Sequence, residues 1–162
     1  MSRKKTTRER GKFKTQIHSA LYKSADIKDL LLGDTSNMSS AQIAKEFKEQ
    51  VKSHLFIDDT ITEAKTFIFY DVFMPSLASQ IKECQIIMYL ICHRSILETY
   101  SKEGYVGDRI DILSEMVEDA LINNTDVVNN FGIGELVLSE IEPYNSSRFY
   151  GCIMTFDIPS FR

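Results

Sequence analysis

Two pairs of predicted β-strands flank one predicted amphipathic helix between Thr66 and Pro159. The strand segments are rich in β-branched and aromatic residues, and glycine, proline and asparagine lie between them. The segment 84–92 is apolar on both faces, so both faces need cover. Helices of this chain can cover one face, and a neighbouring subunit can cover the other. The order predicts an α+β fold in which N-terminal helices and one central helix pack on a mainly antiparallel sheet of about four strands, arranged as two β-hairpins.

The four strands are expected over residues 66–74, 84–92, 135–142 and 149–158. In the last one every second residue is apolar, which is typical of an antiparallel strand packed on one side; these residues are Tyr150, Cys152, Met154, Phe156 and Ile158. The link between the first two strands, Ser76 to Glu83, is too long for a tight turn. We expect this loop to project from the body and to contact other subunits, with Ser76, Gln80 and Lys82 as candidate contact residues.

Helix signals precede the strands and separate the two hairpins. Apolar residues at helical spacing predict a helix over Phe13–Lys23, and a second one capped by Ser24 ends at Gly33. Ser39 with Gln42 forms a capping-box signature for a third helix. Asp108 with Asp111 opens the central helix, whose apolar stripe ends before Asn123.

The net charge of −4 is unevenly distributed. Residues 1–14 carry seven cations and one carboxylate, a local charge of +6, which leaves −10 on residues 15–162. We predict a basic, flexible N-terminal arm over 1–14 and a single α+β domain over 15–162. The arm is interpreted either as a solubilising terminus or as a contact to nucleic acid or to an acidic partner, through Arg3, Lys4, Lys5 and Arg8.

The three cysteines, Cys84, Cys92 and Cys152, all fall in predicted strands and have no CxxC spacing. This pattern is typical of small buried side chains in a reducing compartment and argues against a zinc site. The longest apolar run covers about eight residues, well below the roughly twenty that span a bilayer. The charged N-terminus is not followed by an apolar segment, so we expect a soluble protein without a signal peptide.

Residues with the chemistry of a metal-dependent nuclease lie near one another in sequence. His54, Asp58 and Asp59 could hold a divalent cation, and Glu63 with Lys65 has a Glu-x-Lys spacing seen in nucleases. The acidic residues sit in a short polar break, however, and not on a preceding strand. We interpret this segment as a solvated loop.

Other catalytic and binding patterns are incomplete. His93 follows Cys92 directly, and neighbours in a strand point to opposite faces, so His93 is predicted to be a polar residue at a strand end. Gly132-Ile-Gly134 lacks the third glycine and the helix of a phosphate-binding loop. The aromatic residues of the first strand, Phe67, Phe69, Tyr70 and Phe73, have few cations beside them, so core packing is favoured over base stacking. We expect a protein without a catalytic site, a metal or a cofactor.

Four segments, together with the order of the elements, resemble the small neck and tail proteins of tailed bacteriophages, and most of all tail terminators, also called tail-completion proteins. These segments are Lys52–Asp59, Thr66–Met74, His93–Leu97 and Gly104–Leu113. The resemblance extends over roughly residues 15–160 by element order, without a diagnostic catalytic or binding motif.

The resemblance implies a structural protein of the virion, located at the junction of neck and tail and present in the host cytoplasm during assembly. A ring of copies, six in that family, would cap the tail tube protein, stop tube growth and offer its other face to the head connector. Genomic DNA would pass through the ring without sequence-specific binding. Exposed acidic residues of the central helix, Asp111 and Glu115, are further candidate contacts. A head-to-tail connector or neck protein and a small metal-dependent nuclease stay open as alternatives.

Overall fold

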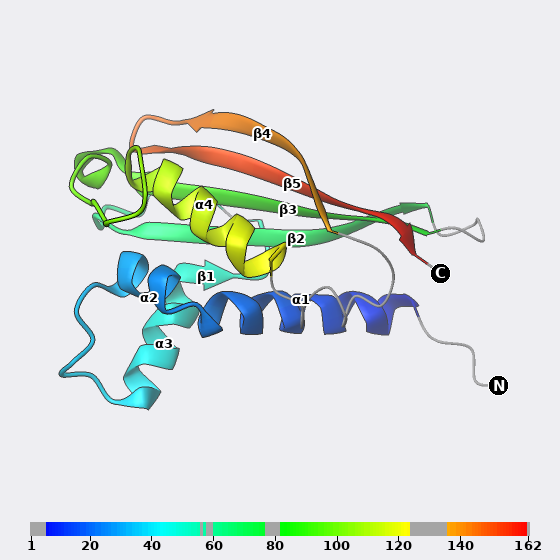
Figure 1. Cartoon of the computed structure of the whole chain (residues 1–162), viewed down its shortest axis with the longest axis horizontal. Helices are drawn as coiled ribbons and strands as arrows, with labels where there is room; N and C mark the ends of the chain where they lie inside the picture. The colour runs from blue at the N-terminus through cyan, green and yellow to red at the C-terminus, as the bar shows by residue number, and fades with distance from the viewer. Residues whose placement is uncertain (1–5, 56, 58–59, 77–81, 124–135, 162) are drawn as a thin grey trace.

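A sheet and a layer of helices make up the described part of this chain. The computed structural model describes residues 6–55, 57, 60–76, 82–123 and 136–161. Within these residues, five strands form one sheet, and four α-helices share an apolar cluster with one of its faces (Figure 1). The predicted α+β class is confirmed.

The helices are α1 (Thr6–Lys23), α2 (Ala25–Leu32), α3 (Ser40–Gln50) and α4 (Arg109–Leu121), with a short 3₁₀ helix, η1, over Arg94–Ile96. Three of the helices, α2, α3 and α4, begin at the predicted capping residues. The Ser24 side chain accepts from the backbone of Ile27, and Gly33 ends α2 with a φ of 70°. Both predicted capping boxes are present, at the starts of α3 and α4.

Helix α1 starts at Thr6, earlier than the predicted start at Phe13. Residues 6–14, which the sequence predicted to be a flexible arm, are therefore helical, and Phe13 is only 5% exposed. The helix extends to Thr6 because Arg10 binds Asp71 and Val72 of the sheet. This tertiary contact stabilises the first turns of α1, which lack apolar residues of their own. Residues 1–5 of the predicted arm lie outside the described residues.

The sheet has the order β1-β2-β3-β5-β4. Its strands are β1 (Val51–Lys52), β2 (Thr66–Ser76), β3 (Lys82–His93), β4 (Val137–Asn145) and β5 (Phe149–Phe161). β1 is parallel to β2, and the other pairs are antiparallel. Four strands match the predicted ones, whereas β1 was not predicted because two residues carry no periodicity.

Two connections differ from the prediction. Ser76 pairs with Glu83, so the ladder of β2 and β3 reaches into the segment predicted to be a long projecting loop. β4 continues through Pro143, where a turn was expected. Proline is tolerated there because β4 is an edge strand, so the missing N–H removes no bond of an inner ladder.

The core lies between the helices and the inner face of the sheet. On β3 this face carries five side chains that are each at most 1% exposed: Cys84, Ile86, Met88, Leu90 and Cys92. The predicted alternation of β5 is confirmed, since Cys152, Met154, Phe156 and Ile158 are buried against the same cluster. No helix in the described part of the chain is both long and apolar enough to span a membrane.

The outer face of the sheet is covered in part by the chain itself. Phe67, Phe69, Ile91 and Phe149 are buried there, and Ile57 and Ile61 of the segment before β2 pack against them. Core packing of Phe67, Phe69 and Tyr70 is thus confirmed. Phe73, further along β2, is 53% exposed and does not follow that prediction, because the cluster does not extend to it.

Candidate functional site

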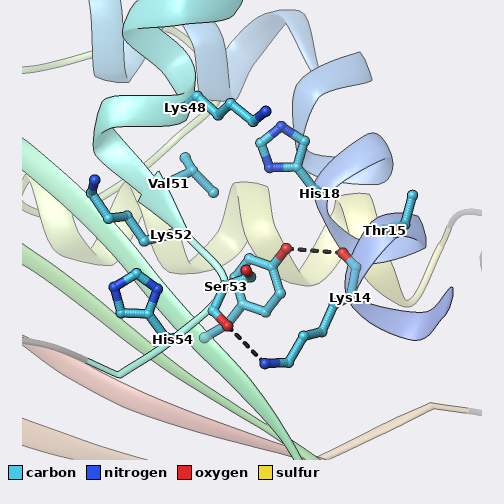
Figure 2. Close-up of a pocket in the computed structure, with 9 residues that line it drawn as sticks. Lys14, Thr15, His18, Lys48, Val51, Lys52, Ser53 and His54 are labelled. Atoms are coloured by element: carbon cyan, nitrogen blue, oxygen red, sulfur yellow. Dashed lines mark hydrogen bonds between the residues drawn. The ribbon is translucent and has the colours of Figure 1, made fainter. Parts of the chain in front are cut away.

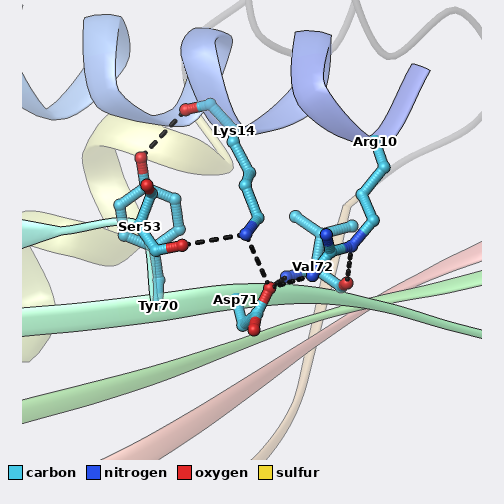
Figure 3. Close-up of polar contacts among 6 residues, drawn as sticks. All are labelled: Arg10, Lys14, Ser53, Tyr70, Asp71 and Val72. Carbon is cyan, nitrogen blue, oxygen red and sulfur yellow. Dashed lines mark hydrogen bonds and ion pairs between the residues drawn. The ribbon is translucent and has the colours of Figure 1, made fainter. Parts of the chain in front are cut away.

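Helix α1 covers the part of the β2 edge that β1 leaves unpaired. In the described chain, β1 pairs only with Ile68 and Phe69 of β2. Further along, the Nε atom of Arg10 donates to the carbonyl oxygen of Val72 at 2.8 Å (Figure 3). An open edge offers its backbone groups to strands of other molecules, so this contact protects the edge from such pairing.

Asp71 is held by two cations of α1. Its Oδ1 atom lies 2.5 Å from Nη2 of Arg10 and 2.9 Å from Nζ of Lys14 (Figure 3). Burial raises the pKa of Asp71, but the hydrogen bonds from Lys14 and from the Val72 amide, with the two positive charges, outweigh burial and lower it. The carboxylate is therefore ionised at neutral pH and ties β2 to the helix.

Lys14 has two further contacts that fix α1 to the start of the sheet. Its Nζ atom donates to the carbonyl oxygen of Ser53 at 2.9 Å, just after β1. The hydroxyl of Tyr70 donates to the carbonyl oxygen of Lys14 at 2.9 Å, and burial raises the pKa of Tyr70 well above its usual value. This edge of the sheet is thus closed by side chains of α1.

The opposite edge, formed by β4, is open in the described chain. β4 pairs with β5 and with no other described strand. Two large apolar side chains on it are exposed, Val137 by 43% and Ile141 by 54%. An open edge strand with exposed branched residues has the features of a surface that another chain covers.

Glu140 and Glu142 give this edge a negative charge. They lie opposite Thr155 and Ile153 on the outer face, and both are exposed. The hydrogen bond with Glu142, and then its charge, raise the pKa of Glu140. Among the described residues, no cation forms an ion pair with either glutamate. A cationic surface on a partner would relieve this repulsion.

The outward face of α1 has the opposite charge. Arg8 and Lys12 are one helical turn apart, so they share a face, and both are exposed. This face points away from the one that carries Arg10 and Lys14. β4 is the last strand in the sheet, and helix α1 binds β2 near the other edge, so the β4 edge and α1 lie on opposite sides of the molecule (Figure 1). The molecule therefore has an acidic edge on one side and a basic helix on the other.

The contact residues predicted from the sequence are scattered. Arg3, Lys4, Lys5 and Gln80 lie outside the described residues. Ser76 is the last residue of β2 and Lys82 the first of β3, so these two share the end of one hairpin. Arg8 belongs to the basic face of α1 described above.

On α4, Asp111 and Glu115 are exposed but differ in their contacts. The Oδ2 atom of Asp111 accepts from the backbone N–H of Asp108 at 2.9 Å, as part of the capping box. Glu115 has no such bond among the described contacts. Only Glu115 can therefore be changed without disturbing the start of the helix.

The residues considered for nuclease chemistry are not assembled in the described chain. Nζ of Lys65 lies 2.8 Å from Oε2 of Glu63, so these two form an ion pair, and Asp58 and Asp59 lie outside the described residues. In the part of the chain that the structure describes, no group of three or more potential ligands could hold a metal ion.

Two further candidates from the sequence are His93, considered as a catalytic base, and the Gly132-Ile-Gly134 segment, considered as a phosphate-binding loop. His93 ends β3 and accepts from the backbone of Ser95, whereas Cys92 is buried on the other face, so the prediction for His93 is confirmed. Gly132-Ile-Gly134 lies outside the described residues.

The acidic β4 edge was missed by sequence reasoning. Its signal is Glu140-Ile-Glu142, which alternates as any half-buried strand does, and the sequence does not show that β4 is an edge strand. The order β5-β4 at the end of the sheet depends on tertiary pairing.

Comparison with known proteins places the chain in a family. A family model described as YomW matches residues 16–158, which is most of the chain. No curated protein and no solved structure matches this chain. The match begins within α1 and ends within β5, so it includes β1 to β4 and most of β5. The chain therefore belongs to the YomW family, which is associated with bacteriophages, and is a phage-related protein.

Proposed function

We propose that this protein is a tail terminator, whose copies form a ring that caps the tail tube and joins the tail to the head connector. The observation that carries the proposal is the pairing of an open, acidic β4 edge with a basic α1 at the far side of the same subunit. The phage association of the family and the resemblance to tail terminators support the same assignment.

Two different surfaces at opposite sides of a subunit favour a head-to-tail contact. Such a contact closes into a ring when the rotation between neighbours allows it. In this arrangement Glu140 and Glu142 of one copy face Arg8 and Lys12 of the next, and Ile141 loses its exposure to water. Six copies are proposed from the resemblance.

The ring acts by occupying a surface and not by making or breaking a bond. It binds the last ring of the tail tube protein and so blocks the addition of another. The opposite side binds the connector of the filled head, and genomic DNA passes through without sequence-specific contacts. The protein is then located at the neck of the virion, after assembly in the host cytoplasm.

A charge-swap experiment tests the subunit contact. Glu142→Lys alone and Arg8→Glu alone are expected to shift the purified protein toward monomers in native mass spectrometry, because each places like charges together. Mixing the two variants places opposite charges at both kinds of mixed contact and is expected to yield oligomers in which the variants alternate. Lys45→Glu, on the exposed side of α3, is the matched control and should assemble as the wild type does.

The assembly role is tested by deleting the gene from its phage or prophage and viewing the lysate by negative-stain electron microscopy. Filled heads beside detached tails of uncontrolled length are expected. Tails of normal length beside tailless heads would instead assign the protein to the head-to-tail connectors. Normal infectious particles would contradict a role in either place.

A further inference from the structure

A cavity of about 450 Å³ lies between α1, α3 and the segment that follows β1. Its walls carry five basic side chains, and no carboxylate is among the described residues that line it. The basic residues are Lys14, His18, Lys48, Lys52 and His54, so both helices and the strand contribute (Figure 2). The three lysines among them concentrate positive charge in a chain of net charge −4.

Lys14 forms the fixed side of the cavity. Its charge is matched by Asp71, and its ammonium also donates to the Ser53 carbonyl oxygen, as Figure 2 shows. Tyr70, another lining residue, is held by its hydrogen bond to the Lys14 backbone. These contacts make this side of the cavity a prearranged surface, which lowers the entropic cost of binding.

Lys48 supplies the cavity with positive charge that no ion pair neutralises, whereas Lys52 projects away from His18 (Figure 2) and also lines a neighbouring pocket with Glu49 and Glu63. Neither forms an ion pair or a hydrogen bond with described residues. Lys48 projects from α3 toward His18 on α1 (Figure 2). Burial and then the charge of Lys48 lower the pKa of His18, so the cavity already disfavours another cation. An anion is the ligand that this environment would stabilise.

We propose that this cavity binds the phosphate chain of a small phosphorylated ligand, a nucleotide being the chemical class that fits. The ammonium group of Lys48 would bind phosphate oxygens as a mobile point charge opposite the fixed side formed by Lys14. Val51 and Tyr70 form the floor of the cavity and are only 2% and 1% exposed, so they shape it and add little contact area. The volume falls in the range of small-ligand sites, roughly 300–1,000 Å³. This site is separate from the β4 edge, so the inference does not depend on the proposed ring.

Isothermal titration calorimetry with tripolyphosphate and with ATP, at about 0.1 M NaCl, tests the site. Both are expected to bind the wild-type protein, and Lys48→Gln is expected to weaken binding by about tenfold. Lys45→Gln is the matched control, because this lysine lies on α3 outside the cavity and should leave the affinity unchanged. Thermal melting of every variant establishes that each is folded.

Three outcomes would overturn the inference. One is the absence of heat with either phosphate compound while the protein is folded. Another is an equal loss of affinity in Lys45→Gln, which would indicate general attraction to surface charge. The third is tighter binding of a single-stranded DNA oligonucleotide that depends on Lys48, which would make the cavity a nucleic-acid contact and not a small-ligand site.

Discussion

The guanidinium of Arg10 donates a hydrogen bond to Oδ1 of Asp71, a residue 61 positions later in the chain. The same guanidinium donates through Nε to the carbonyl oxygen of Val72. One side chain therefore binds both a side chain and a backbone group of β2 and fixes α1 along the edge of that strand. This contact explains why residues before Phe13 are helical.

Arg10→Ala is expected to lower the free energy of unfolding by about 1–2 kcal/mol, since a charged hydrogen-bond donor is lost from a partly buried site. Urea unfolding followed by circular dichroism measures this. Lys12→Ala, two residues along the same helix and exposed, should change stability by less than about 0.5 kcal/mol. Equal effects of the two substitutions would mean that the contact with β2 contributes nothing.

Stability should fall in acid partly through Asp71. The pKa of this carboxyl is lowered in the folded protein, so its contribution is present above the unfolded pKa, near 3.8, and is lost as pH falls through the folded value. Asp71→Asn replaces the titrating carboxyl group with an amide that does not ionise. Thermal midpoints of the two proteins should therefore differ at pH 7, and the difference should shrink as the pH falls below 3.8. A constant difference across this range would contradict the assignment.

Much of the fold could be predicted because its signals are local. Ser24, Ser39 and Asp108 each begin a helix through a side-chain hydrogen bond that needs no tertiary partner. The strands follow from alternation and β-branched content. Local signals fail where a distant group decides the structure, as at Arg10 in α1 and at the two-residue β1, which exists only through its pairing with β2.

The candidate site was less predictable for the same reason. Glu140 and Glu142 matter because β4 lies at the edge of the sheet, and strand order is not encoded in the periodicity of one segment. The basic cavity joins Lys14 and His18 on α1 to Lys48 on α3, which lies 30 residues after His18 in the sequence. Asp111 shows the converse case, since a residue predicted to be a contact also caps its own helix.

Gln50 is a buried polar residue that joins α2 to β2. Its Nε2 atom donates to the carbonyl oxygens of Leu31 at 2.8 Å and of Thr66 at 3.0 Å. Gln50→Leu leaves both acceptors without this donor in a buried site, so a loss of about 1–3 kcal/mol is expected in urea unfolding. Glu46→Ala, one turn earlier and exposed, is the control. A neutral effect of Gln50→Leu would indicate that the carbonyl groups find other donors.

The three cysteine thiols should be unreactive in the folded protein. Burial raises the pKa of Cys84 and Cys92 to about 11 and that of Cys152 to about 12. The thiolate is the reactive form, so little of it exists at pH 8. Ellman's reagent is expected to modify none of the three rapidly in buffer and all three in urea. Rapid modification in buffer would show that the strands open.

Gly151 of β5 lies opposite Ile91 of β3, and a side chain has no room there. A β-carbon placed on it would lie 1.8 Å from the carbonyl oxygen of Leu90 and 2.8 Å from Cα of Ile91, so Gly151→Ala must push the two strands apart. A loss of about 1–3 kcal/mol is expected from this overpacking. Gly11→Ala is the matched substitution, because a β-carbon there meets nothing within 4 Å in a helix, and it should stabilise by about 0.5–1 kcal/mol. Urea unfolding of the two purified variants and of the wild-type protein measures both changes in the free energy of unfolding. Stabilisation by Gly151→Ala would mean that β3 and β5 do not approach as described.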